Sequence, residues 1–144
     1  MDWHLLVLFG GLFVVTHAFG ATGLPEDALA TLAAFDLQPD RLLVLAPITL
    51  VGASAIGNVP LVVLLLAVVP DMSEGALYAL AVLSTLAGNL LIVGSLANII
   101  AIERAASAGV RVSFLEHARC GLPITLLSLA LALVWLAGMG YIRP

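Results

Sequence analysis

Long apolar runs alternate with short polar segments along this chain. The apolar runs cover residues 5–23, 42–70, 76–102 and 122–142, and the charged side chains gather between them. A helix needs about 20 apolar residues to cross a hydrocarbon core of about 30 Å. The runs over 5–23, 76–102 and 122–142 therefore predict three membrane-crossing helices.

The run over 42–70 fits neither one crossing nor two. It contains roughly 28 residues, whereas two crossings need about 40, and both Pro47 and the sequence Gly57-Asn58-Val59-Pro60 interrupt it. We expect a re-entrant hairpin whose arms meet at this second interruption, within the membrane. A single long helix with a proline kink is the alternative.

The run over 76–102 is polar in its middle. That part contains Gly88, Asn89, Gly94, Ser95 and Asn98. An amide in hydrocarbon costs several kcal/mol unless it is hydrogen-bonded, and glycine weakens a helix. We therefore predict a crossing helix broken between about Asn89 and Asn98, beside other protein or a water-filled cavity. The alternative is that these small residues only let helices pack closely.

Two polar segments begin helices. Residues 24–41 predict a surface segment with a short helix that opens at Pro25 and lies on the membrane. Asp71 and Glu74 match a capping box, with Asp71 as the N-cap of the broken crossing. Both segments are rich in Asp and Glu and contain a single arginine, Arg41.

The third polar segment, 103–120, predicts a loop and an interfacial helix. Ser113 and Glu116 form a second capping box, and Gly121 is expected to end this short helix before the last crossing. The segment also carries three of the five arginines. Arginine-rich loops lie on the cytoplasmic side of membranes, so we expect segment 103–120 in the cytoplasm. Residues 24–41 and the C-terminus then lie on the outer side of the inner membrane.

Composition supports an integral membrane protein. Apolar residues make up 62% of the 144 and charged residues 10%, against about 45–50% and 25% in soluble domains. A net charge of -4 without any lysine offers no surface for nucleic acid. One cysteine, Cys120, excludes an internal disulfide and a cysteine-built metal site.

The sequence contains no pattern typical of an enzyme. The apolar runs hold no Asp or Glu, and neither HExxH nor Gly-x-Ser-x-Gly occurs. His17 is the titratable side chain deepest in an apolar run, and a neutral interfacial role is favoured over a functional one. We expect no catalytic residue, no cofactor and no resident metal.

A series of motifs resembles the C-terminal half of the ion transporter superfamily, which includes arsenite permeases, NhaD-type antiporters and citrate, dicarboxylate and sulfate permeases. The motifs are Phe9-Gly10-Gly11-Leu12-Phe13-Val14, Thr22-Gly23-Leu24, Asn58-Val59-Pro60, Gly88-Asn89-Leu90, Gly94-Ser95-Leu96-Ala97-Asn98 and Gly121-Leu122-Pro123. The resemblance covers nearly the whole chain. It implies an all-α integral membrane fold of two inverted repeats, each with three crossings, one of them broken, and a re-entrant hairpin.

By this resemblance, residues 1–144 form a single membrane domain, and the N-terminal repeat of the carrier is missing. The implied substrate or ion ligands are Asn58, Asn89, Ser95 and Asn98, with Gly57 and Gly94 at the backbone turns. The complete carrier would be a homodimer in the lipid bilayer. Na⁺ at the same residues, or H⁺, would be the coupling ion.

This chain departs from the resemblance in two respects. Gly57 stands where many members have a polar or titratable residue, so no carboxylate proton relay is visible. Only one repeat is present, which indicates a fragment or truncated product, and the arginine bias argues against a self-complementing dual-topology dimer. The predicted function is half of a secondary active carrier for a small anion, either an oxyanion such as arsenite or sulfate or a di- or tricarboxylate. The alternative is a small membrane scaffold or accessory subunit.

Overall fold

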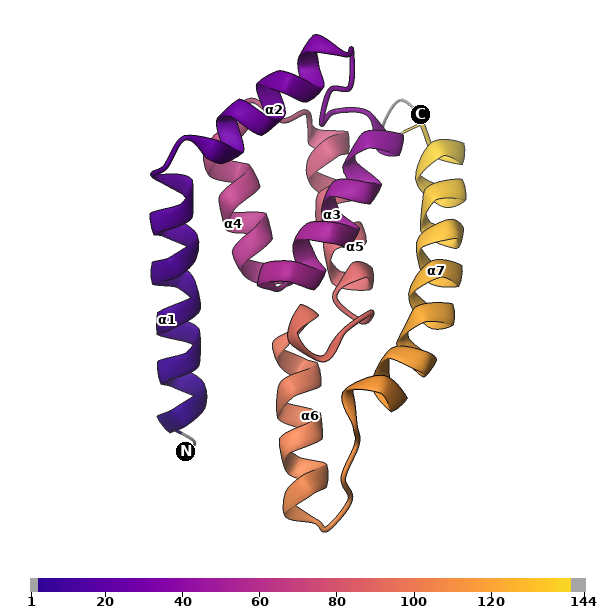
Figure 1. Ribbon diagram of the computed structural model, residues 1–144. Coiled ribbons are helices and arrows are strands. Elements are labelled where there is room, and N and C mark those ends of the chain that lie inside the picture. Colours follow the sequence, from indigo (N-terminus) through magenta and orange to yellow (C-terminus); the bar gives the residue numbers. More distant parts are fainter. Residues whose placement is uncertain (1–2, 141–144) are drawn as a thin grey trace.

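The computed structural model describes residues 3–140, and all regular structure in this range is helical (Figure 1). The helices are α1 (Trp3–Gly20), α2 (Leu24–Ala34), α3 (Leu42–Ile56), α4 (Asn58–Val68), α5 (Glu74–Ala87), the 3-10 turn η1 (Ile92–Gly94), α6 (Leu96–Ser107) and α7 (Phe114–Gly138). The prediction of an all-α fold is confirmed for these residues.

Helices α3 and α4 form a hairpin joined by one residue, Gly57 (Figure 1). Gly57 has φ 89° and ψ 154°, a conformation that side-chain-bearing residues rarely adopt. Gly52 lets the arms approach, because a Cβ there would collide with the side chain of Leu61. The predicted turn lies at Gly57, and the described chain forms two packed helices here instead of one kinked helix.

The core lies where α3, α5 and α7 meet, with α4 on one side. Leu45, Leu80, Leu83 and Leu136 are fully buried in it. Alanines at the seams of the core, such as Ala53, are also fully buried. Small residues at these seams let the helices approach closely, which is how helices associate inside membranes.

The N-terminus of α5 differs from the prediction. Ser73 is the N-cap, and its hydroxyl accepts a hydrogen bond from the backbone N–H of Ala76 at 3.3 Å. The assignment of Asp71 as N-cap is wrong, because α5 begins at Glu74 and Asp71 lies in the turn before it. Serine and aspartate cap equally well, so the local pattern alone does not choose between them.

Helix α7 begins at the predicted capping box. The Ser113 hydroxyl accepts from the N–H of Glu116 at 3.2 Å, and the Ser113 N–H donates to the Glu116 carboxylate at 2.8 Å. The helix then continues through Gly121 and Pro123 to Gly138. The predicted helix end at Gly121 is wrong: the segments 103–120 and 122–142 share one helix.

Gly121 serves close packing instead of ending a helix. A Cβ there would lie 2.7 Å from the carbonyl oxygens of Asn89 and Leu90. Only a glycine allows the backbone of α7 to approach the loop after α5 this closely. The same residue type therefore satisfies a different requirement from the one inferred from sequence.

Helix α7 is long and apolar enough to cross a membrane, and α1 with α2 passes the same test as a pair bent by 56°. Helices α3, α4 and α5 are shorter apolar helices. The crossing predicted over 76–102 is divided between α5 and α6. The last two residues of the crossing predicted over 122–142, and the C-terminus expected on the outer side, lie outside the described residues.

Candidate functional site

The turn of the α3–α4 hairpin lies against the loop between α5 and α6. Asn58 is the first residue of α4, and Ser95 directly precedes α6. A Cβ placed on Gly88 would lie 3.4 Å from the Cβ atoms of both Asn58 and Ser95. Two of the predicted ligands, about 37 residues apart in sequence, therefore lie next to the same glycine.

Two glycines, Gly88 and Gly94, are in close backbone contact at the helix break. Helix α5 ends at Ala87 and α6 begins at Leu96, which confirms the predicted interruption. A Cβ on Gly94 would lie 2.7 Å from the Gly88 carbonyl oxygen, and one on Gly88 would lie 2.8 Å from that of Gly94. The close-packing interpretation of these glycines is therefore correct as well, because neither position has room for a side chain.

Asn98 binds the freed backbone of the break. Its Nδ2 donates to the carbonyl oxygens of Gly88 at 3.0 Å and Leu91 at 3.2 Å. A carbonyl released from a helix needs such a partner when it is shielded from water. Asn98 thus fixes the path of the loop, a role that sequence reasoning did not assign to it.

A small cavity lies beside the hairpin turn. It has a volume of about 30 Å³ and is bounded by the turn, η1, α6 and α1; its lining includes Gly57, Asn58, Val93 and Leu96. This is about the volume that one water molecule occupies. The side chain of Asn58 is half-buried there, and its Oδ1 accepts from the N–H of Val59 at 3.0 Å.

The predicted residues are not equally placed. Gly57 and Asn58 line this cavity, Gly94 and Ser95 lie in the adjoining break, and Asn98 lies in the first turn of α6. Asn89 contributes its carbonyl to the contact with Gly121 of α7 instead. The structural role of Gly121 was missed from sequence, since a glycine two residues before a proline also suits a helix end.

Two helix N-termini meet at this site. Helices α4 and α6 begin at Asn58 and Leu96, and both residues line the cavity. In the first turn of α4 the Val59 N–H is bonded to Asn58 Oδ1 and Pro60 has no N–H, whereas the side chain of Ser95 makes no capping hydrogen bond to α6. First-turn N–H groups that are not capped attract anions, and the helix dipole adds to this.

Charged side chains of the described residues lie away from this site. Glu116, at the exposed start of α7, has its pKa lowered because the backbone N–H and then the hydroxyl of Ser113 donate to its carboxylate. In the range 3–140, no three His, Cys, Asp or Glu side chains gather as a metal site would require. His17 is exposed and lines a separate cavity with Thr16 and Glu26.

Comparison with known proteins gives one family. The CitMHS profile, described as citrate transporter, matches residues 1–87, which cover α1 to α5. A 46 kDa membrane protein of Mycobacterium leprae is 36% identical over 94% of this chain and 34% of its own length. The rice silicon efflux transporter LSI3 (Oryza sativa subsp. japonica) is 34% identical over 92% of this chain and 30% of its own length.

A further relative, the uncharacterized transporter Rv2684 of Mycobacterium tuberculosis, is 31% identical over 94% of this chain and 34% of its own length. The chain thus spans about a third of the length of these relatives. No solved structure matches it. The family match and the named transporters agree with the resemblance seen in the motifs, and they make this a membrane protein of a transporter group. The chain belongs to the CitMHS citrate transporter family.

Proposed function

We propose that this chain is one of two inverted repeats of a secondary active membrane carrier for a small anion. Its three crossings are α1, the broken pair α5–α6, and α7, and the α3–α4 hairpin re-enters the membrane between the first two. The observation that supports this most directly is the contact between the hairpin turn and the helix break, at Gly88. Secondary transporters bind substrate where such turns and broken helices meet.

The anion would be held by first-turn N–H groups of α6 and by the dipoles of α4 and α6 in place of arginine, because in the first turn of α4 the Val59 N–H is already bonded and Pro60 has no N–H. The arginines of the described chain lie in loops or near helix ends, whereas the N-termini of α4 and α6 point their positive dipole ends towards the turn and the break. Asn58 and Ser95 add amide and hydroxyl groups beside them. An oxyanion or carboxylate is the ligand class that this arrangement favours.

Oxygen atoms of the same residues would bind a coupling cation. Asn58 and Ser95 carry neutral side-chain oxygens, and Asn98 uses its Nδ2 for the loop, which leaves Oδ1 for a ligand. Sodium prefers such oxygen ligands, and H⁺ coupling would need a titratable group from elsewhere in the carrier. Gly57, Gly94 and Asn89 complete the proposed site through their backbone.

The rest of the carrier is part of the proposal. A cavity of about 30 Å³ holds a single ion or water but no carboxylate substrate. The second repeat, N-terminal to this one, would supply the other wall of the site, and the complete carrier would form a homodimer. Residues 103–120 would be cytoplasmic, with residues 24–41 and the C-terminus on the outer side of the inner membrane.

Uptake into proteoliposomes by the full-length carrier tests this function. Radiolabelled sulfate, arsenite and citrate are each offered with a Na⁺ or an H⁺ gradient. Asn58→Ala should reduce uptake of the transported anion by about tenfold or more, as loss of one or two good hydrogen bonds to a charged ligand does. The matched control is Ser54→Ala in the same hairpin, because the Ser54 hydroxyl bonds only within α3, to Leu50 at 2.7 Å.

Equal uptake by Asn58→Ala, Ser54→Ala and the parent would contradict the assignment. Protein amount in the vesicles is measured for each variant, so that lost insertion is not taken for lost transport. If no anion is taken up by the parent under either gradient, the scaffold alternative is favoured.

A further inference from the structure

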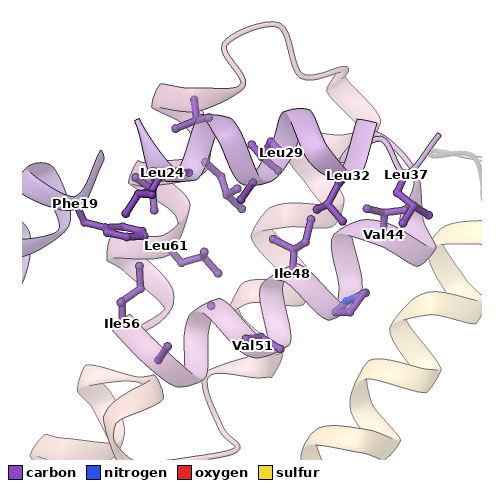
Figure 2. Close-up of a pocket in the computed structure, with 18 of the residues that line it drawn as sticks. Phe19, Leu24, Leu29, Leu32, Leu37, Val44, Ile48, Val51, Ile56 and Leu61 are labelled. Carbon is purple, nitrogen blue, oxygen red and sulfur yellow. The ribbon is translucent and has the colours of Figure 1, made fainter. Parts of the chain in front are cut away.

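A large apolar cavity separates α2 from the α3–α4 hairpin (Figure 2). Its volume is about 660 Å³, and every side chain that lines it is apolar or a glycine. Figure 2 shows Leu29 and Leu32 of α2 on one side and Ile48 and Val51 of α3 on the other. Helix α2 has no fully buried residue, and Leu29 and Leu32, which face the hairpin, are only half-buried.

The cavity is open to the surroundings of the protein, so its lining forms a continuous apolar surface that is not covered by other described residues. The side chains of this lining offer water no hydrogen-bond partner, and covering apolar surface is favourable. The lining therefore favours an apolar occupant, and a hydrocarbon chain is the apolar material that surrounds a membrane protein.

Charged groups border one end of the cavity. Figure 2 shows Leu37 and Val44 together at one end, and Asp36 and Arg41 are close neighbours of these two residues in sequence. The Arg41 guanidinium forms an ion pair with Asp36 at 2.7 Å, and 46% of the arginine side chain and 72% of the aspartate side chain are exposed. A zwitterionic head group could place its phosphate on Arg41 and its amine on Asp36, since both partners are open to solvent.

We propose that the cavity between α2 and the hairpin binds an acyl chain of one phosphatidylethanolamine molecule, whose head group lies on the Asp36–Arg41 pair. The lipid would then be the layer that joins α2 to the hairpin. This proposal depends on the membrane placement that the family gives, and it does not depend on the anion site.

Photo-crosslinking in the full-length protein tests the acyl chain. The probe is phosphatidylethanolamine with a diazirine in the middle of one acyl chain, mixed into phosphatidylcholine vesicles, and labelled peptides are identified by mass spectrometry. We expect peptides from residues 24–56 to be labelled more than the outer face of α7, which exposes Leu127 and Leu131 to bulk lipid. The ratio of the two is the measured quantity.

Two phenyl rings should displace the lipid. Ala28→Phe with Ala55→Phe adds bulk to α2 and α3 inside the cavity, and both alanines are exposed to it. The labelling ratio should fall about tenfold, because the rings occupy the space of the chain. The matched control is Ala130→Phe, at an exposed position of α7, which should leave the ratio unchanged. Ala28→Phe alone is the second variant, since α2 has no buried residue to disturb.

The head group is tested by Arg41→Gln, with Arg111→Gln in an exposed loop as control. The labelling ratio should fall severalfold in the first variant and stay constant in the second. An unchanged ratio in Arg41→Gln would overturn the head-group assignment. An unchanged ratio in the phenylalanine variants would overturn the acyl-chain site. If the peptides from residues 24–56 are not labelled in the parent, the acyl-chain site is also overturned. That result would mean that another part of the carrier covers this face.

Discussion

Two kinds of helix N-terminus occur in this molecule, and they differ in what satisfies their first-turn N–H groups. At α5 and α7, which begin outside the proposed site, Ser73 and Ser113 cap the helix with their hydroxyls. At α6, Ser95 occupies the same N-cap position, and its hydroxyl makes no such bond. Helices α2 and α3 also begin without a side-chain cap, at Gly23 and Arg41, so the contrast concerns only the three helices whose N-cap is a serine. Among these three, α6 is the one whose serine hydroxyl is not used for capping.

The backbone of the two regions differs as well. Ser73 and Ser113 follow polar segments and begin regular helices, whereas Ser95 follows a break in which glycine backbones are in contact. An open N-terminus next to a rigid break is preorganised for an anion, because no protein group has to be displaced before binding. Substitutions in the two regions should therefore have different consequences for stability and for transport.

The break should be the least tolerant part of the chain. Gly94→Ala places a Cβ 2.7 Å from the Gly88 carbonyl oxygen, so the backbone of the site must move. We expect a destabilisation of about 2–4 kcal/mol, seen as a lower thermal midpoint in detergent by about 5–15 °C. The control is Gly10→Ala in α1, where a Cβ meets nothing within 4 Å. Equal midpoints for both variants would show that the break is not tightly packed.

Asn98 should affect both stability and transport. Asn98→Ala removes two hydrogen bonds to loop carbonyls, which costs about 1–3 kcal/mol when the acceptors are left without partners. Asn98→Asp keeps the size of the side chain, but its carboxylate cannot donate a hydrogen bond to the two carbonyl oxygens. It should therefore be destabilised at least as much as Asn98→Ala. Thermal unfolding and anion uptake are measured together. A fully stable Asn98→Ala would mean that water replaces the amide at both carbonyls.

The two serines should respond in opposite ways. Ser113→Ala removes a capping bond and should lower stability by about 1 kcal/mol without changing uptake. Ser95→Ala should leave stability nearly constant and lower uptake of the anion, because its hydroxyl caps nothing. If both variants lose stability equally, Ser95 is an ordinary N-cap and the contrast between the two regions disappears.

The smallest effect concerns pH at the start of α7. Hydrogen bonds from Ser113 lower the pKa of Glu116 below the usual 4.5. The contribution of this carboxylate to stability is therefore fully present above pH 4.5, and it is lost as pH falls through the lowered pKa. The difference in thermal midpoint between the parent and Glu116→Ala should shrink below pH 4.5. A difference that grows with acidity would contradict the capping geometry.

Features set by local sequence could be predicted well. The length of the 42–70 run together with Gly57 gave the hairpin turn, and the polar residues within 76–102 gave the helix break. The Ser113 box was also correct, because its hydrogen bonds lie within four residues. Depth and orientation in the membrane stay predictions.

Features set by tertiary contacts could not be predicted. Gly121 has the spacing of a helix end, and only the path of the loop after α5 reveals that it contacts Asn89 and Leu90. Asn98 could be recognised as a polar group that needs partners, but the carbonyls it binds are up to ten residues away along an irregular backbone. The choice between Asp71 and Ser73 depended on where α5 begins, which sequence fixes only within a few residues.

The contact at Gly121 has a consequence for motion. The loop carbonyls rest directly on the backbone of α7, so a shift of this helix by about one turn along its axis would bring a side chain of the same face, Ala118 or Thr125, beneath them. Neither side chain would fit in that space. Helix α7 therefore cannot slide past the loop after α5 unless the loop moves with it.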